Sequence, residues 1–131
     1  MIDKFHSSLI GVALIGFAGC TMASMPPNQD HTFNQPELVV EQAALDALAF
    51  SGFFVTTHNA NFLQGFRPRL VGGKWCNAGG ETVTIRLQES SPSTTTALIT
   101  TELSSYGLLC QKDWTGELLS EIESSLSKKE Q

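Results

Sequence analysis

The chain has 131 residues and a formal net charge of −5 at pH 7. A chain of this length forms one domain at most. The acidic balance argues against nucleic acid or an anionic membrane surface as the main partner, because both carry the same sign of charge as the chain.

The N-terminal stretch predicts a secretory signal peptide over residues 1–19. Lys4 is its only fixed cationic side chain, and the apolar run LIGVALIGFAG follows over residues 9–19. This run is too short to span a bilayer as a mature helix, and its length is typical of the hydrophobic part of a signal peptide. We therefore exclude residues 1–19 from the fold.

The end of the apolar run, FAGC, resembles the lipobox of bacterial lipoproteins. Ala18, Gly19 and Cys20 match that pattern, whereas Phe17 stands where a leucine-like residue is usual. The resemblance implies that Cys20 is acylated, with palmitate among its acyl chains, and becomes the mature N-terminus. It also implies an outer-membrane lipoprotein facing the periplasm, because Thr21 replaces the aspartate that tends to retain such proteins at the inner membrane.

The segment that follows is expected to be flexible, so that residues 20–36 form the lipid anchor and its tether. Proline, asparagine and serine are frequent there and apolar residues are few. His31 is expected to be solvated. An alternative to lipidation is ordinary cleavage after residues 21–23, which would remove Cys20 and release a soluble periplasmic protein.

A helix is predicted from Glu37 to about residue 51. Asn34 and Glu37 stand at the spacing of a capping box, in which two side chains satisfy free backbone N–H groups. Apolar side chains then recur at three- and four-residue steps, as in a helix that lies on a sheet. Gly52 is placed to end the helix, and residues 53–57 (FFVTT) have the composition of a strand.

Residues 58–68 lack periodicity and contain asparagine, glycine and proline, which predicts an irregular connection. Phe62, Phe66, Arg67 and Arg69 bring aromatic and cationic side chains together there. One interpretation is a partner-contact loop for an anionic envelope component. The other is that both phenylalanines pack onto the core while the aliphatic parts of the arginines cover it.

The clearest strand signal lies in residues 81–104, after a further predicted strand over residues 70–76. Val83, Ile85 and Leu87 alternate with polar residues, which is the two-residue period of a strand with one buried face. A polar stretch with a proline separates this strand from a second, threonine-rich one. Residues 81–104 are therefore predicted to form a β-hairpin.

Three cysteines occur in the chain, and in an exported protein Cys76 and Cys110 are left to form a disulfide, because Cys20 is either acylated or removed. Such a bridge would stabilise the fold by roughly 3 to 4 kcal/mol in the chain-entropy model. No Cys-x-x-Cys spacing indicates a redox-active pair, and two cysteines without paired histidines supply too few ligands for zinc. We expect no metal site and no cofactor.

A second amphipathic helix is predicted to begin after Asp113, its N-cap, and to end near residue 127. Its apolar residues recur at three- and four-residue steps: Trp114, Leu118, Leu119, Ile122 and Leu126. The folded domain is thus expected at residues 37–127, with residues 128–131 as a tail.

The predicted order of elements is α-β-β-β-β-α. It indicates a two-layer α+β fold with both helices on one face of an antiparallel sheet of three to four strands. The stretches GGETVTIRL and KDWTGELLSEI resemble small bacterial envelope lipoproteins of α+β type. That resemblance implies the same fold and supplies no catalytic residues.

No enzyme is expected from the sequence. It contains no G-x-S-x-G motif, and His58 is the only histidine of the predicted domain. We expect a non-enzymatic, lipid-anchored accessory or structural module of the cell envelope. It would contact a protein or glycan partner through its sheet face, an edge strand or the loop over residues 62–69.

Two alternatives stay open. The first is a small periplasmic inhibitor or ligand-binding protein; an inhibitor would present a rigid protruding loop, for which residues 59–69 are the candidate. The second is a hydrolase, which would place His58 close to a buried carboxylate.

Overall fold

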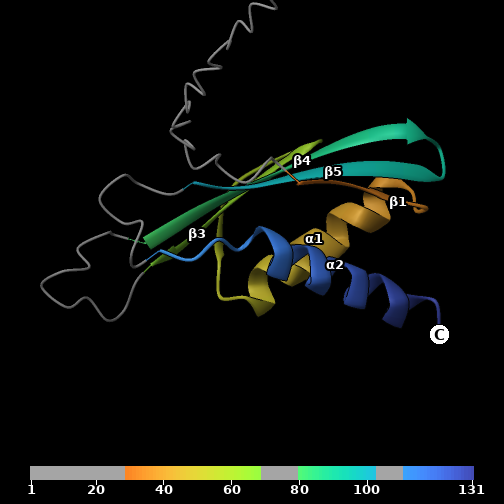
Figure 1. The fold of residues 1–131 in the computed structure, drawn as a ribbon. Coiled ribbons are helices and arrows are strands. Elements are labelled where there is room, and N and C mark those ends of the chain that lie inside the picture. The colour runs from red at the N-terminus through yellow and green to blue at the C-terminus, as the bar shows by residue number, and fades with distance from the viewer. Residues whose placement is uncertain (1–28, 69–79, 103–110) are drawn as a thin grey trace, which may run out of the picture.

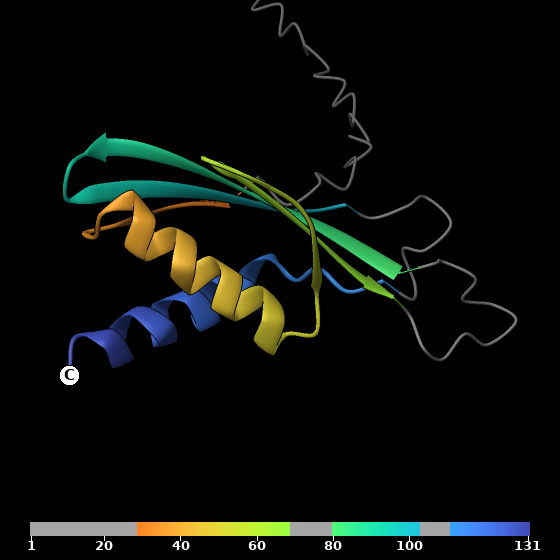
Figure 2. The same cartoon turned by 180° about the vertical axis from the view of Figure 1, so that it is seen from behind.

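The computed structural model describes residues 29–68, 80–102 and 111–131. These residues form two layers, an antiparallel five-stranded sheet and two helices on one of its faces (Figure 1 and Figure 2). The strands lie in the order β1-β5-β4-β3-β2. In chain order the elements are β1 (Gln29–Phe33), α1 (Glu37–Phe50), β2 (Phe54–Asn59), β3 (Phe62–Pro68), β4 (Gly80–Ser91), β5 (Thr94–Glu102) and α2 (Thr115–Lys129).

The predicted α+β class is confirmed, but the sheet has five strands instead of the three to four expected. Two of the five strands, β1 and β3, were not predicted. The first of them, β1, lies inside the stretch predicted as a tether. It pairs with β5, so that Asp30 lies beside Leu98, and Phe33 is buried in the core. The tether prediction was wrong from residue 29 onwards, because a short edge strand needs little apolar content beyond one buried side chain.

The strand β1 also gives His31 a partner. Its Nε2 lies 3.3 Å from Glu123 Oε1 of α2. The tether placement of His31 was therefore wrong, because residue 31 belongs to the sheet and faces the helical layer. Its side chain is still 39% exposed, so it remains solvated as expected.

Helix α1 has the predicted bounds, but its first turn differs from the expectation. Pro36 precedes the helix and no side chain caps it, so the capping box of Asn34 and Glu37 was wrong. Instead, the Thr95 hydroxyl of β5 donates to the Gln35 carbonyl oxygen at 2.9 Å. The sheet therefore fixes the entry into α1 through a hydrogen bond between residues far apart in the sequence.

The stretch predicted as an irregular connection is a β-hairpin, in which residues 60–61 join β2 and β3. Gly65, which favoured a loop in the sequence, lies in β3 and permits close packing. A Cβ at this position would lie 3.1 Å from Leu48 Cδ2 and 3.2 Å from Phe53 Cβ. The loop prediction was wrong because this glycine serves packing between the layers rather than a turn.

The predicted hairpin over residues 81–104 is confirmed for its described part by β4 and β5. Ile85 lies beside Ile99, and Leu87 lies beside Ala97. All four side chains are buried under the helices. Gly52, predicted to end α1, has a φ of +81°, a conformation that glycine adopts without strain.

The core lies between the sheet and the helices. Its buried residues come from every element of the described chain except the edge strand β2, and from the segments that flank α1 and α2. They are Phe33, Val40, Ala43, Ala44, Ala47, Leu48, Phe53, Leu63, Val83, Ile85, Leu87, Ala97, Ile99, Trp114, Leu118, Ile122 and Leu126. The apolar positions predicted for the last helix are thus buried, except for Leu119, which is partly buried.

Several predictions concern residues outside the described part of the chain. These are Cys20, Cys76, Cys110, Arg69 and the strand over residues 70–76. The lipid anchor and the disulfide therefore stay predictions. Within the described ranges, neither helix has the length and hydrophobicity needed to cross a membrane.

Candidate functional site on the helix-free face of the sheet

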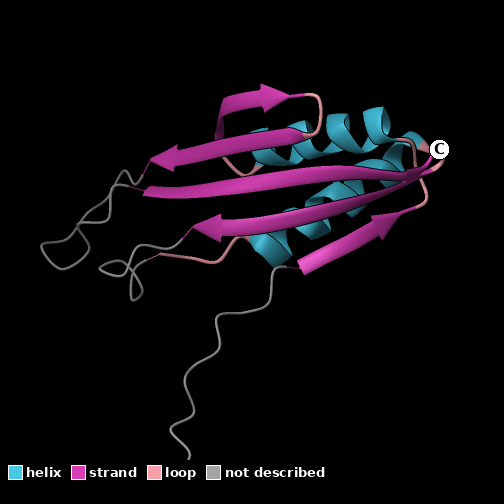
Figure 3. Cartoon of the chain, turned by 90° about the horizontal axis from the view of Figure 1, so that it is seen from above, coloured by secondary structure: helices cyan, strands magenta, loops and turns pink. Residues whose placement is uncertain are grey.

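One face of the sheet carries no helix, and we call it the helix-free face (Figure 3). Side chains alternate along a strand and directly paired residues point to the same side, so the register defines which residues share this face. The strand β4 shows the alternation clearly. Val83 and Ile85 are buried under the helices, while Thr84 and Arg86 point the other way.

The pairing arranges the helix-free face in rows that cross the strands. One row, which we call the groove row, contains Asp30 of β1, Leu98 of β5, Arg86 of β4 and Phe62 of β3. Two further rows contain Thr100, Thr84, Gln64 and Thr57, and then Glu102, Thr82, Phe66 and Phe54. The face therefore combines phenylalanine with hydroxyl, amide and a few charged side chains.

The groove row lines a shallow groove of about 680 Å³. Asn61, Gln88 and Thr96 contribute to its lining as well. Gln88 and Thr96 are paired with each other one step along the same face, and Asn61 belongs to the turn before β3. The groove thus crosses β1, β5, β4 and β3 instead of following a single strand.

Two groups of the groove row are in direct contact. The guanidinium carbon of Arg86 lies 5.7 Å from the centroid of the Phe62 ring. This distance is within the range of about 6 Å over which an aromatic face attracts a cation. The ring and the guanidinium therefore form one contact surface, which combines an apolar face with hydrogen-bond donors.

The residues predicted to form a contact loop do not form a loop. Phe62 and Phe66 lie in β3 and point to the helix-free face, so they do not pack onto the core. Arg67 points to the opposite face, and Arg69 lies outside the described residues. Both interpretations of this stretch missed the alternation of β3, which sends the phenylalanines one way and Arg67 the other. Of the second interpretation, only the expectation that Arg67 covers the core agrees with the structure.

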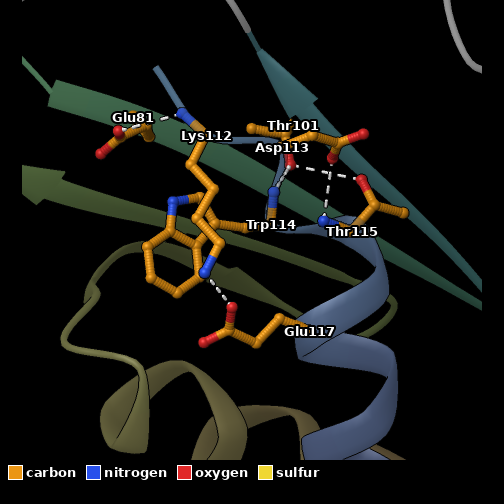
Figure 4. Close-up of polar contacts among 7 residues, drawn as sticks. All are labelled: Glu81, Thr101, Lys112, Asp113, Trp114, Thr115 and Glu117. Atoms are coloured by element: carbon orange, nitrogen blue, oxygen red, sulfur yellow. Dashed lines mark hydrogen bonds and ion pairs between the residues drawn. The ribbon is translucent and has the colours of Figure 1, made fainter. Parts of the chain in front are cut away.

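On the helix-covered side, Arg67 packs on Trp114, with its guanidinium carbon 4.5 Å from the centroid of the indole ring. Lys112 Nζ lies 4.1 Å from the same ring, and Phe53 meets the ring edge-on with 5.4 Å between centroids. Figure 4 shows Lys112 reaching past Trp114 to Glu117, with which it forms an ion pair. Because Trp114 is only 6% exposed, both cations cover the core here.

The start of α2 is held to β5 by hydrogen bonds, also seen in Figure 4. Thr101 Oγ1 accepts the Trp114 N–H at 3.0 Å, and Asp113 Oδ1 accepts the Thr115 N–H at 2.9 Å. Partial burial alone would raise the pKa of Asp113, but hydrogen bonds from the side chain and backbone of Thr115 and from the Thr101 side chain lower it below its ordinary value. The predicted N-cap was therefore off by one residue: the N-cap is Trp114, and Asp113, directly before it, accepts the Thr115 N–H.

His58 has a carboxylate partner. Its Nε2 lies 2.5 Å from Glu41 Oε1 of α1, and the Glu41 side chain is 16% exposed. The hydrolase alternative requires a carboxylate close to His58, and the distance to Glu41 satisfies that requirement. Covalent catalysis also requires a nucleophile within reach of the histidine. In the fold, the bond ties the edge strand β2 to α1, and neither residue lines the groove.

Within ranges 29–68, 80–102 and 111–131, no three histidine, cysteine or acidic side chains are grouped so that they could hold a metal ion. The groove is lined by polar, aromatic and aliphatic side chains.

Sequence reasoning missed most of the groove row. The alternation with Val83, Ile85 and Leu87 did predict that Arg86 lies on the outer face, but it did not indicate which residues lie beside it. Leu98 was a second signal, because it is out of phase with Ala97 and Ile99. Asp30 gave no signal, because β1 was not predicted.

Comparison with known proteins adds no family to this description. No family model matches the sequence, and no curated protein matches it.

Proposed function

We propose that the chain is a non-enzymatic lipoprotein of the cell envelope, anchored by acyl chains on Cys20 to the outer membrane and facing the periplasm. Its folded part acts as an accessory module that contacts a partner through the helix-free face. The sequence Ala18-Gly19-Cys20 supports the anchor. Several acyl chains would hold the protein firmly, at about 0.8 kcal/mol for each buried methylene group.

The proposed anchor lies close to the sheet in the sequence. Because β1 begins at Gln29, residues 20–28 would be the whole tether. Nine residues span at most about 30 Å when fully extended. The helix-free face would therefore work near the membrane surface.

The helix-free face is the observation that carries the proposed contact function. Both helices pack on the other face, and the helix-free face bears Phe54, Phe62, Phe66 and Leu98 among polar residues. Phe54 is 67% exposed. Exposed apolar groups surrounded by polar side chains are typical of binding surfaces.

A soluble periplasmic ligand-binding protein is the second candidate, and the groove on the helix-free face favours it. The inhibitor version of that alternative relied on a protruding loop over residues 59–69. Residues 59–68 are instead paired in β2 and β3 or form the short turn between them, so that version is not proposed.

The anchor is tested by the intact mass of the protein isolated from the cell envelope, with and without reductant. We expect a chain that begins at Cys20, carries acyl groups and gains two hydrogens on reduction. The variant Cys20→Ala should leave the membrane fraction. An unmodified wild-type chain that begins near Ser24 would contradict the anchor and favour the soluble ligand-binding protein.

The contact function is tested by chemical crosslinking in cells with a pair of surface variants. Phe54→Ser removes an exposed apolar side chain from the helix-free face, and Leu38→Ser removes one from α1 as a matched control. We expect Phe54→Ser to reduce crosslinked product and Leu38→Ser to leave it unchanged. The opposite pattern would contradict the helix-free face as the contact surface.

A further inference from the structure

We propose that the groove on the helix-free face binds an uncharged oligosaccharide, laid across the strands along the groove row. This inference rests on the proposed function, because the groove lies on the face that we propose for partner contact. It does not depend on the lipid anchor.

The charges of the groove row favour an uncharged ligand. Asp30 and Arg86 lie in the same row, separated by Leu98. An anionic ligand that extends along the row would approach Asp30, and a cationic one would approach Arg86. A ligand without net charge meets neither repulsion, and it can accept hydrogen bonds from Arg86 and donate them to Asp30.

The side chains match the two kinds of surface that a sugar ring presents. The C–H groups on one side of a pyranose ring pack against aromatic and aliphatic surfaces, which Phe62 and Leu98 supply. The hydroxyl groups at its rim both donate and accept hydrogen bonds. Asn61 and Gln88 carry amides with both functions, beside the guanidinium of Arg86.

The length of the groove row favours an oligosaccharide over a single sugar. From Asp30 to Phe62 the row crosses three interstrand gaps of about 4.8 Å, which amounts to roughly 14 Å. A chain of linked sugar rings could contact Phe62 at one end and Asp30 at the other. A monosaccharide is too short to contact Phe62 and Asp30 at the same time.

The direction of the groove argues against an extended peptide. Such a peptide satisfies its backbone N–H and C=O groups by adding to the edge of a sheet. The groove instead runs over β5 and β4, whose backbones are already paired on both sides. A peptide laid there would leave its backbone groups without partners from the sheet, whereas the hydroxyls of a sugar need only side chains.

The first test is a titration of the isotopically labelled protein, isolated in a zwitterionic detergent that has no sugar headgroup. The probes are two β-1,4-linked trisaccharides, one of glucose and one of N-acetylglucosamine. We expect saturable NMR shift changes for at least one of them, centred on the groove row and smaller at Phe54 and on the helices. Binding by only the acetylated probe would identify the acetamido group as a required feature.

Variants with matched controls test which side chains bind. Phe62→Ala should weaken the affinity by about tenfold or more, because it removes the aromatic surface. Phe50→Ala removes another exposed phenylalanine, at the end of α1, and should leave the affinity unchanged. Arg86→Met should weaken binding, whereas Arg67→Met, on the opposite face, should not.

Two results would overturn the inference. One is the absence of saturable shifts with both probes. The other is binding that Phe62→Ala and Arg86→Met leave unchanged while both variants remain folded. Neither result would contradict the lipid anchor or the crosslinking of a partner through the helix-free face. Failure of the sugar site is therefore distinguishable from failure of the proposed function.

Discussion

The two faces of the sheet are built from the same strands but differ in what covers them. On the helix-covered face, Leu63, Val83 and Ile85 are fully buried. On the helix-free face, the neighbouring residues Phe62, Thr84 and Arg86 remain accessible. The alternation of a strand therefore lets one side chain in two stabilise the fold and leaves the next one available for binding.

The sharpest test of this division is a pair of neighbouring substitutions in β3. Leu63→Ala should lower the free energy of unfolding by about 2 to 5 kcal/mol, because it opens a cavity in the core. Phe62→Ala should cost only about 0.2 to 1 kcal/mol, the range of a cross-strand pair. Urea unfolding measures both, and equal losses would contradict the division of the faces.

A second test concerns the close approach of the two layers at Gly65. Gly65→Val should destabilise the fold by about 1 to 3 kcal/mol, because its side chain would press on Leu48 and Phe53. Gly116→Ala is the control, since an added Cβ there meets nothing within 4 Å. It should stabilise the helix by about 0.4 to 1 kcal/mol. Thermal unfolding compares the two, and a neutral Gly65→Val would show that the layers are not closely packed there.

A smaller and pH-dependent effect is expected where α2 joins the sheet. Asp113→Ala should cost about 1 kcal/mol near neutral pH, because the Thr115 N–H loses its acceptor. The pKa of Asp113 is lowered in the folded state, so its contribution is present above the ordinary carboxyl pKa and is lost as the pH falls through the lowered value. Urea unfolding of wild type and variant should converge in acid; an unchanged difference would contradict this account.

Local patterns were enough to predict most elements of the covered face. The alternation in β4, the three- and four-residue steps of α2 and the glycine after α1 each reflect burial against the other layer. The prediction failed where a residue's role depends on a distant partner. Gly65 faces Leu48, and β1 is recognisable only through its pairing with β5.

The candidate site was less predictable than the fold, for a physical reason. The groove row joins residues from four strands, and only the register brings Asp30, Leu98, Arg86 and Phe62 together. The alternation of a strand indicates which side chains are exposed, but it does not indicate which exposed side chains of other strands lie beside them. Of the residues predicted for partner contact, Phe62 and Phe66 lie on the helix-free face. The prediction that Arg67 shares a surface with them was wrong, because Arg67 packs on Trp114 on the helix-covered side.

The most direct test of the central claim is site-specific photo-crosslinking in cells. A photoreactive phenylalanine analogue is placed at Thr84, in the middle of the helix-free face, and in a second variant at Ser120, which is exposed on α2. Our account predicts a discrete crosslinked product from position 84 and none from position 120. A product from position 120 alone would contradict the assignment of the helix-free face as the contact surface.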